Sequence, residues 1–261
     1  MTLVVRVAAV TAALSLAVAG CSAPNESSAP PSTGDTGGGK LVVFAAASLK
    51  KSFTEIGEQF RTDNPGSDVE FNFAGSSDLV TQLMQGAPGD VFASADTMNM
   101  GKAAQADLLA ANPVDFASNT LTIVTAQGNP KKVSSFNDLS QPGLSVVVCA
   151  PQVPCGSAVE KVEKATGVQL DPVSEESQVT DVLNKVTSGE ADAGLVYVTD
   201  ALGAGDKVTS VPFPESAEAV NTYPIAVLKQ AGDLDLAGKF VDLVTGEAGQ
   251  KVLDAAGFAK P

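Results

Sequence analysis

Serine residues stand at two points where a predicted strand gives way to a predicted helix. Ser48 follows three alanines in the stretch FAAASLKK, and Ser76 and Ser77 follow Ala-Gly in FAGSSDL. A serine at a helix start often only caps the helix, because its hydroxyl accepts a hydrogen bond from a backbone N–H. The small residues beside these serines indicate a second role, since they leave room for a ligand to approach the backbone. We therefore expect Ser48 and one serine of the neighbouring pair to bind a ligand.

Two further helix starts and one tyrosine are also candidates for this site. The loop CAPQVPCGSAVEK leads into a helix near Cys155, the stretch SEESQVTDVL opens a helix at about Val179, and Tyr197 follows the run AGLV. Beyond the carboxyl ends of parallel strands, helix N-termini point toward a common ligand crevice. Neither lysine nor arginine precedes the helix in these stretches. We expect four helix starts and one phenol to converge on an uncharged site.

Short apolar runs alternate with helical patterns along the part of the chain that holds these residues. The predicted strands are Leu41–Ala45, Val69–Phe73, Val91–Ala93, Leu121–Thr125, Leu144–Val148, Ala193–Val198 and Pro224–Leu228. The predicted helices are Leu49–Arg61, Ser77–Gln85, Met98–Leu109, Ser157–Ala165, Val179–Val186, Leu234–Val244 and Glu247–Ala256. This alternation is typical of an α/β fold, in which right-handed crossovers through helices join parallel strands. Residues 40–261 are long enough for one large domain or two small lobes.

The composition excludes several classes of function. Acidic residues number 30 and basic residues 16, without a basic run, so no nucleic acid partner is expected. The lack of histidine excludes Ser-His-Asp and Cys-His catalytic systems and histidine-ligated metal sites. The chain has no tryptophan and only two tyrosines, Tyr197 and Tyr223, which argues against a site that stacks sugars or bases.

The N-terminal residues have the pattern of export and anchoring signals. Residues 7–19 form an apolar run behind Arg6, too short to span a bilayer and typical of a signal peptide. The run ends in VAGC, which resembles the bacterial lipoprotein signal and implies a signal peptide over 1–20 and a lipidated Cys21. The alternative is an ordinary secretory signal with an incidental cysteine. Residues 21–39 are rich in Ser, Pro and Gly, and we expect a flexible tether at the outer face of the cell membrane.

The two remaining cysteines bracket a short loop. Cys149 and Cys155 flank the sequence APQVP. An exported protein can form disulfides, and the close spacing favours a bond between these two; two free thiols are the alternative. A bond would hold the loop, and with it the Cys155 N–H, ready for a ligand.

Six motifs together resemble the molybdate-binding proteins of bacterial ABC importers: VVFAAASL, FAGSSDL, GAPGDVFASAD, VPCG, GLVYVTDA and the final AGF. The resemblance runs from about Val42 to Phe258. It implies a two-lobed fold of the type II periplasmic-binding-protein superfamily, in which each lobe is a mostly parallel sheet flanked by helices and the ligand cleft lies between them. We expect residues 40–120 and 223–261 to form lobe I and residues 121–222 to form lobe II.

The family's ligand positions are two serines, two backbone N–H groups at helix starts and one tyrosine, which fall here at Ser48, Ser76, Cys155, Val179 and Tyr197. Ser77 is the alternative to Ser76. Cys155 stands where a small residue such as alanine is common, which is harmless if only its N–H is used. Gly75 stands where serine is common, so the site has one hydroxyl fewer. The resemblance implies no cofactor besides the molybdate or tungstate ligand. It implies a permease and its ATPase as partners, and we expect a monomer that is not an enzyme.

Molybdate suits such a set of donors. At neutral pH it is a tetrahedral dianion with four acceptor oxygens and no proton, so it needs donors only. Hydroxyls and backbone N–H groups are donors, and each helix N-terminus adds about half a positive charge. We therefore expect Ser48 both to cap its helix and to face the ligand. Tungstate has nearly the same size and charge, and the sequence does not separate the two.

Other ligands and one enzymatic reading compete with molybdate. Sulfate differs mainly in size, whereas phosphate carries a proton and would need an acceptor such as Asp78, which more readily stabilises its helix N-terminus. Ferric sites rely on tyrosine pairs, often with histidine. Ser48 to Lys51 match S-x-x-K, the first motif of penicillin-binding proteins and β-lactamases, but S-D-N and K-T-G are absent.

Overall fold

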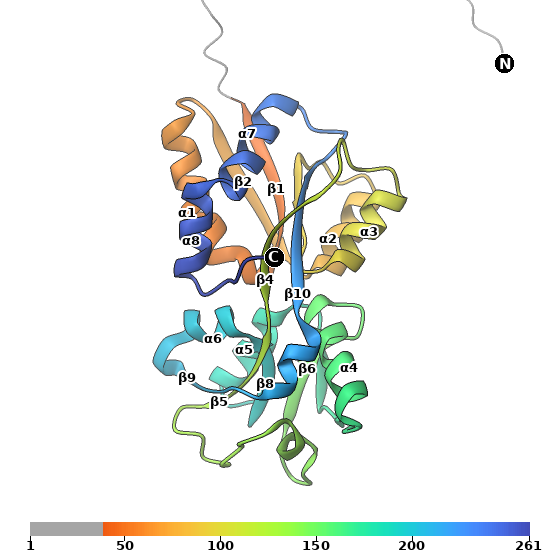
Figure 1. The fold of residues 1–261 in the computed structure, drawn as a ribbon, viewed down its shortest axis with the longest axis vertical. Coiled ribbons are helices and arrows are strands. Elements are labelled where there is room, and N and C mark those ends of the chain that lie inside the picture. Colours follow the sequence, from red (N-terminus) through yellow and green to blue (C-terminus); the bar gives the residue numbers. More distant parts are fainter. Residues whose placement is uncertain (1–38) are drawn as a thin grey trace, which may run out of the picture. The chain divides into compact units, whose positions relative to one another are not determined.

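A computed structural model describes residues 39–261, which form two α/β lobes (Figure 1). The signal peptide, Cys21 and nearly all of the tether predicted from the sequence lie outside the described residues. The sheet of lobe I has the strand order β2-β1-β3-β10-β4, and that of lobe II has the order β7-β6-β8-β5-β9. In each sheet four strands run in one direction and the fifth, β10 or β5, runs against them. The predicted two-lobed fold with mostly parallel sheets is confirmed.

The strands of lobe I are β1 (Lys40–Ala46), β2 (Asp68–Ala74), β3 (Val91–Ala93), β4 (Val114–Asn119) and β10 (Asn221–Val227). Those of lobe II are β5 (Leu121–Ala126), β6 (Val146–Cys149), β7 (Ser174–Glu176), β8 (Ala193–Tyr197) and β9 (Val208–Val211). The chain enters lobe II directly from β4 to β5 and returns to lobe I between β9 and β10. All seven predicted strands are present. The one predicted to end at Val198 ends at Tyr197, because Val198 begins a helix.

The helices of lobe I are α1 (Lys50–Asp63), α2 (Ser76–Met84), α3 (Thr97–Gln105), α7 (Leu234–Thr245) and α8 (Glu247–Ala255). Those of lobe II are α4 (Pro154–Thr166), α5 (Val179–Thr187) and α6 (Val198–Ala204). Short 3-10 helices are η1 (Ala47–Leu49), η2 (Phe136–Ser140), η3 (Gly205–Lys207) and η4 (Pro214–Ala219). All seven predicted helices are present, whereas α6 was not predicted.

Each lobe has its own apolar core. In lobe I, helices α1, α7 and α8 cover one face of the sheet and α2 and α3 cover the other (Figure 1). The first face is rich in aromatic contacts: the ring of Phe240 lies 5.9 Å from that of Phe53 and 5.4 Å from that of Phe60, both edge to face. The core of lobe II is built mainly from valine, leucine and alanine. Two separately packed cores allow the lobes to keep their shape if they move relative to each other.

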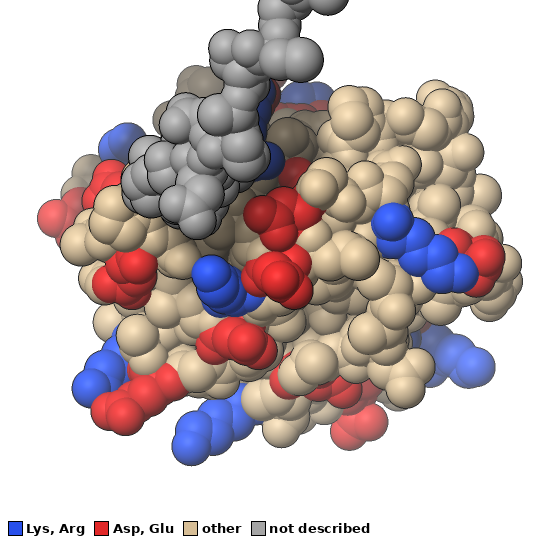
Figure 2. Space-filling model, turned by 90° about the horizontal axis from the view of Figure 1, so that it is seen from above, with Lys and Arg blue, Asp and Glu red and all other residues tan. Residues whose placement is uncertain are grey.

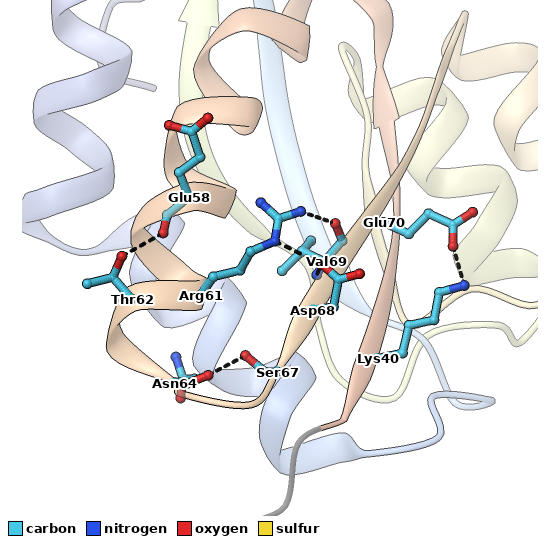
Figure 3. A network of polar contacts seen from close by, with 9 residues as sticks. All are labelled: Lys40, Glu58, Arg61, Thr62, Asn64, Ser67, Asp68, Val69 and Glu70. Carbon is cyan, nitrogen blue, oxygen red and sulfur yellow. Dashed lines mark hydrogen bonds and ion pairs between the residues drawn. The ribbon is translucent and has the colours of Figure 1, made fainter.

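Charged side chains of lobe I pair at the amino ends of its strands. At the start of β2, Arg61 Nε lies 2.8 Å from a carboxylate oxygen of Asp68, and Lys40 of β1 pairs with Glu70 (Figure 3). The hydrogen bond from Arg61 holds the pKa of Asp68 below its usual value. On the face shown in Figure 2, basic side chains are scattered among acidic ones and form no patch. Lys40 and Arg61 lie at the opposite ends of the strands from the ligand crevice expected for this fold.

No helix within residues 39–261 is long and apolar enough to cross a membrane.

Candidate functional site

The carboxyl ends of strands from both lobes meet at one small cavity. It is lined by Ala46, Ala47, Ser48, Gly75, Ser76, Ala95, Val153, Pro154, Cys155, Val179 and Tyr197. Its volume is about 10 Å³, roughly the space of one water-sized sphere and far below the roughly 300–1,000 Å³ of pockets for drug-sized ligands. All five residues predicted to bind the ligand line this cavity. None of its lining residues is charged, and residues 39–261 contain no cluster of acidic or cysteine side chains suited to a metal ion.

Ser48 lies in the 3-10 turn η1 between β1 and α1. Its Oγ is 3.0 Å from the phenolic oxygen of Tyr223, a fully buried residue of β10. The side chain caps neither η1 nor α1, so the prediction that Ser48 caps its helix is wrong. The reason is local: η1 begins one residue before Ser48, which places the serine inside the turn. Its hydroxyl therefore makes no capping hydrogen bond to the backbone of η1 or α1.

Ser76 is the first residue of α2, and Gly75 takes the N-cap position. The Ser76 Oγ accepts a hydrogen bond of 3.0 Å from the N–H of Ala95, which follows β3. Because this bond uses the oxygen and not the hydrogen, the hydroxyl keeps its hydrogen to donate. Ser77 does not line the cavity, and its buried hydroxyl has no partner within residues 39–261. Of the two serines left open by the sequence, Ser76 is therefore the one at the cavity.

Two helices of lobe II direct their N-termini at the cavity. Cys155 is the second residue of α4 and Val179 the first residue of α5. Neither backbone N–H donates to an acceptor within the described part of the chain, as expected in the first turn of a helix. The N-terminus of α2 in lobe I joins them at the same cavity. Three helix N-termini therefore contribute partial positive charge where no cationic side chain lies.

A disulfide joins Cys149 at the end of β6 to Cys155 in α4. The predicted bond is thus present, and the alternative of two free thiols is wrong. The loop between them is tight: the Val153 N–H donates to the Ala150 carbonyl at 2.9 Å. Gly156 is required by this turn, because a methyl group there would lie 2.0 Å from the Ala150 oxygen. The disulfide and the glycine together fix where α4 begins.

Tyr197 ends β8 and is only 1% exposed, yet its hydroxyl has no hydrogen-bond partner within residues 39–261. Its ring packs edge to face on Tyr223 with the ring centres 6.0 Å apart. Burial raises the pKa of the Tyr197 phenol well above its usual value, so the group stays a neutral donor. Leaving a buried polar group unpaired costs about 1–3 kcal/mol. A ligand acceptor in the cavity would offset that cost.

Two acidic residues lie just behind the cavity lining. The Tyr197 N–H donates to a carboxylate oxygen of Asp200 at 3.2 Å, and burial raises the pKa of Asp200 to about 7. Asp96 caps α3 by accepting from the Asn99 N–H at 2.8 Å, and burial raises its pKa as well. Each shift favours the neutral acid, so burial reduces the negative charge behind the site.

Sequence reasoning missed three residues around the cavity because their roles depend on contacts between distant segments. Tyr223 was noted only as one of the two tyrosines of the chain, although its phenol contacts the Ser48 hydroxyl. Ala95 was not noted, although its N–H holds Ser76. Gly75 was treated as a lost hydroxyl, although it lies against the backbone of Ser177 in lobe II. Only Gly75, which precedes the serines directly, had a signal in the sequence.

The two-lobed fold, with helix N-termini from both lobes around one small cavity, is that of a solute-binding protein. The chain belongs to the bacterial extracellular solute-binding protein family, whose model matches residues 41–259. It is 59% identical over 246 residues to the molybdate-binding protein ModA of Mycobacterium tuberculosis, with 94% of this chain and 93% of that protein covered.

Two solved structures share the fold. The substrate-binding domain of a putative molybdenum ABC transporter from Clostridium difficile has 29% identity and a TM-score of 0.64, with 85% of this chain and 99% of that chain covered. The periplasmic molybdate-binding protein of Azotobacter vinelandii has 22% identity and a TM-score of 0.73, with the same two coverages. The resemblance found in the six sequence motifs is confirmed.

Proposed function

We propose that this protein captures molybdate, and equally tungstate, outside the cytoplasm and delivers the anion to the permease and ATPase of an ABC importer. Two independent observations support the proposal. The relative at 59% identity is a molybdate-binding protein, and its match covers 94% of this chain. The cavity is lined by hydrogen-bond donors and small residues without a charged side chain.

The donor set is the observation on which the proposal depends most. The proposed ligands are the hydroxyls of Ser48, Ser76 and Tyr197 and the N–H groups of Cys155 and Val179. The Tyr197 hydroxyl and both N–H groups have no acceptor within the described residues, and Ser76 keeps its hydrogen. A dianion without protons can accept from all five groups. The helix N-termini of α2, α4 and α5 supply the compensating positive charge.

Phosphate fits this cavity less well than molybdate. A protonated phosphate needs an acceptor, and the lining offers no carboxylate. Asp78, the acceptor considered from the sequence, lies in the first turn of α2 with an exposed side chain and does not line the cavity. Sulfate is also a proton-free dianion, so it differs from molybdate here only in size. We expect sulfate to bind more weakly. Its S–O bonds are shorter than the Mo–O bonds of molybdate, so its oxygens reach fewer donors at once.

An acyl-enzyme reaction at Ser48 has no support in the geometry. The hydroxyl of Ser48 contacts a phenol, that of Tyr223, and Lys51 of the S-x-x-K match is exposed to solvent. Activation of a serine nucleophile needs a base within hydrogen-bond reach. A ferric site is equally unsupported, since Tyr197 is the sole tyrosine of the cavity lining.

The location and the anchor form a further part of the proposal. The family consists of extracellular solute-binding proteins, which supports export. We propose cleavage after a signal peptide of residues 1–20, lipidation of Cys21 and a tether over residues 21–39. The tether would hold a monomer at the outer face of the cell membrane. A Cys21→Ser variant that is released from the membrane, together with a mature mass that includes lipid for the unaltered protein, would support this anchor. A membrane-bound Cys21→Ser variant would contradict it.

The ligand proposal is tested by calorimetry with the anion-free protein and a panel of molybdate, tungstate, sulfate and phosphate. We expect tight binding of the first two, weaker binding of sulfate and negligible binding of phosphate. Tighter binding of sulfate would reassign the ligand within the same class of dianions. Phosphate binding as strong as that of molybdate would contradict the donor-only site.

A further inference from the structure

Asn221 connects the two lobes directly behind the cavity. It is the first residue of β10, pairs with Asn119 of β4 in the lobe I sheet, and is 3% exposed. Its side-chain Nδ2 donates to the carbonyl of Ala95 at 2.9 Å and to that of Pro154 at 3.3 Å. Ala95 belongs to lobe I, whereas Pro154 is the first residue of α4 in lobe II. One amide group thus holds the backbone of both lobes.

The contact with Pro154 acts on a proposed ligand donor through a single peptide group. The carbonyl of Pro154 and the N–H of Cys155 belong to the same peptide, which is planar and trans, so the two groups point in opposite directions. Fixing the carbonyl oxygen therefore fixes the direction of the N–H. A hydrogen bond accepted by the carbonyl also polarises the N–H and makes it a stronger donor.

The contact with Ala95 reaches the second donor less directly, because the N–H and the carbonyl of Ala95 belong to two neighbouring peptide groups joined at its Cα. The Ala95 N–H donates to Ser76 Oγ at 3.0 Å, which leaves the Ser76 hydrogen for the ligand. The carbonyl of the same residue is held by Asn221. The side-chain amide of Asn221 therefore donates to two backbone carbonyls, one next to a proposed donor of lobe I and one next to a proposed donor of lobe II. Its oxygen, Oδ1, is buried and has no partner within residues 39–261.

We propose that Asn221 is a positioning residue that aligns the Cys155 N–H and the Ser76 hydroxyl when the lobes are closed, and thereby slows release of the bound anion. The inference rests on the proposed function. The bond to Pro154 crosses between lobes, so it exists only where they are in contact. Asn221 should therefore stabilise the closed, ligand-bound state far more than the fold of either lobe.

The test compares Asn221→Asp and Asn221→Ala with a matched control in the full mature protein. Asn221→Asp keeps the shape but sets a carboxylate against two carbonyl oxygens, whereas Asn221→Ala removes the amide. The control is Asn72→Asp in β2. It removes the hydrogen bond of 2.8 Å that the Asn72 side-chain amide donates to Gln82 within lobe I. The probe is the anion of the calorimetric panel that the unaltered protein binds most tightly.

We expect both Asn221 variants to bind the anion about 10- to 100-fold more weakly, chiefly through faster dissociation in stopped-flow measurements. The melting temperature without anion should change no more than in Asn72→Asp. In the bound state, the amide NMR resonance of Cys155 should shift in the Asn221 variants and stay unchanged in the control.

Dissociation rates equal to those of the control would overturn the inference. A large loss of melting temperature without anion in both Asn221 variants would also overturn it, because Asn221 would then be an ordinary core residue. Absence of molybdate binding by the unaltered protein would contradict the proposed ligand alone, since the comparison would proceed with whichever anion is bound.

Discussion

Replacing Gly75 by alanine should prevent full closure of the lobes. Gly75 is the N-cap of α2, and its backbone angles, φ −60° and ψ 141°, are open to any residue. A methyl group there would lie 2.1 Å from the carbonyl oxygen of Ser177, which precedes α5 in lobe II. Side-chain carbons essentially never come closer than 3.0 Å to such an atom, so the lobes would have to separate by about 0.9 Å at this point.

The cost of this clash falls on the closed state. The atom opposite is a backbone oxygen, which cannot turn aside as a flexible side chain could. Forcing extra volume into a packed contact typically costs about 1–3 kcal/mol, which corresponds to about 5- to 150-fold weaker binding. With the lobes open, the methyl group meets solvent. The free energy of unfolding without anion should therefore fall only through the loss of a good N-cap residue, by about 1 kcal/mol or less, and the melting temperature should change little.

Calorimetry gives the affinity of Gly75→Ala, and small-angle scattering with and without molybdate reports whether the lobes close. The matched control is Gly101→Ala in α3, where an added methyl group meets no atom within 4 Å. We expect the control to bind and close like the unaltered protein. Binding by Gly75→Ala within twofold of the control, with full closure, would refute the view that this glycine permits closure.

Three further predictions concern the electrostatics of the site. Ser76→Ala should weaken molybdate binding about 10- to 100-fold in calorimetry, because a hydrogen bond to a charged group is typically worth about 1.5–3 kcal/mol. Lys51→Ala should bind molybdate normally. A larger loss of affinity in Lys51→Ala than in Ser76→Ala would contradict recognition of the anion by uncharged donors. Tyr197→Phe should weaken binding by about 1–3 kcal/mol without lowering the melting temperature of the anion-free protein, because the buried hydroxyl has no partner to lose there; a large drop would make it a core residue.

The third of these predictions is a pH dependence. Burial raises the pKa of Asp200 to about 7, so the folded state holds this proton more tightly than the unfolded state. This contribution to stability is complete near pH 4 and is lost as the pH rises through 7. Asp200→Asn should therefore show a flatter profile of melting temperature between pH 5 and 8 than the unaltered protein, and parallel profiles would contradict the assignment.

Apolar patterning was sufficient to predict most of the elements that contribute apolar side chains to the cores. The strand at Val91–Ala93 has the predicted bounds, and helix α5 begins at Val179 as predicted, because buried apolar residues define them. Strand β7 was missed because its three residues, Ser174–Glu176, are polar and pair at the sheet edge. Strand β4, with polar residues in half of its length, was missed for a similar reason.

The ligand-facing residues could be predicted because the six motifs supplied the family's ligand positions, and the topology of a parallel sheet brings the segments after its strands together. Contacts between the lobes could not be predicted in this way. The approach of Gly75 to Ser177 and the bonds of Asn221 to Ala95 and Pro154 join residues far apart in the chain. No local pattern distinguishes such a glycine or asparagine from one at an ordinary turn.

A crystal structure of the protein with molybdate, with the metal located by its anomalous scattering, tests the central claim most directly. We predict one strong peak in the cavity, with the oxygens of the anion accepting from Ser48, Ser76, Tyr197 and the N–H groups of Cys155 and Val179. No lysine or arginine should lie within hydrogen-bond distance. A peak elsewhere in the molecule, or a cationic side chain bound directly to the anion, would contradict recognition by neutral donors and helix N-termini.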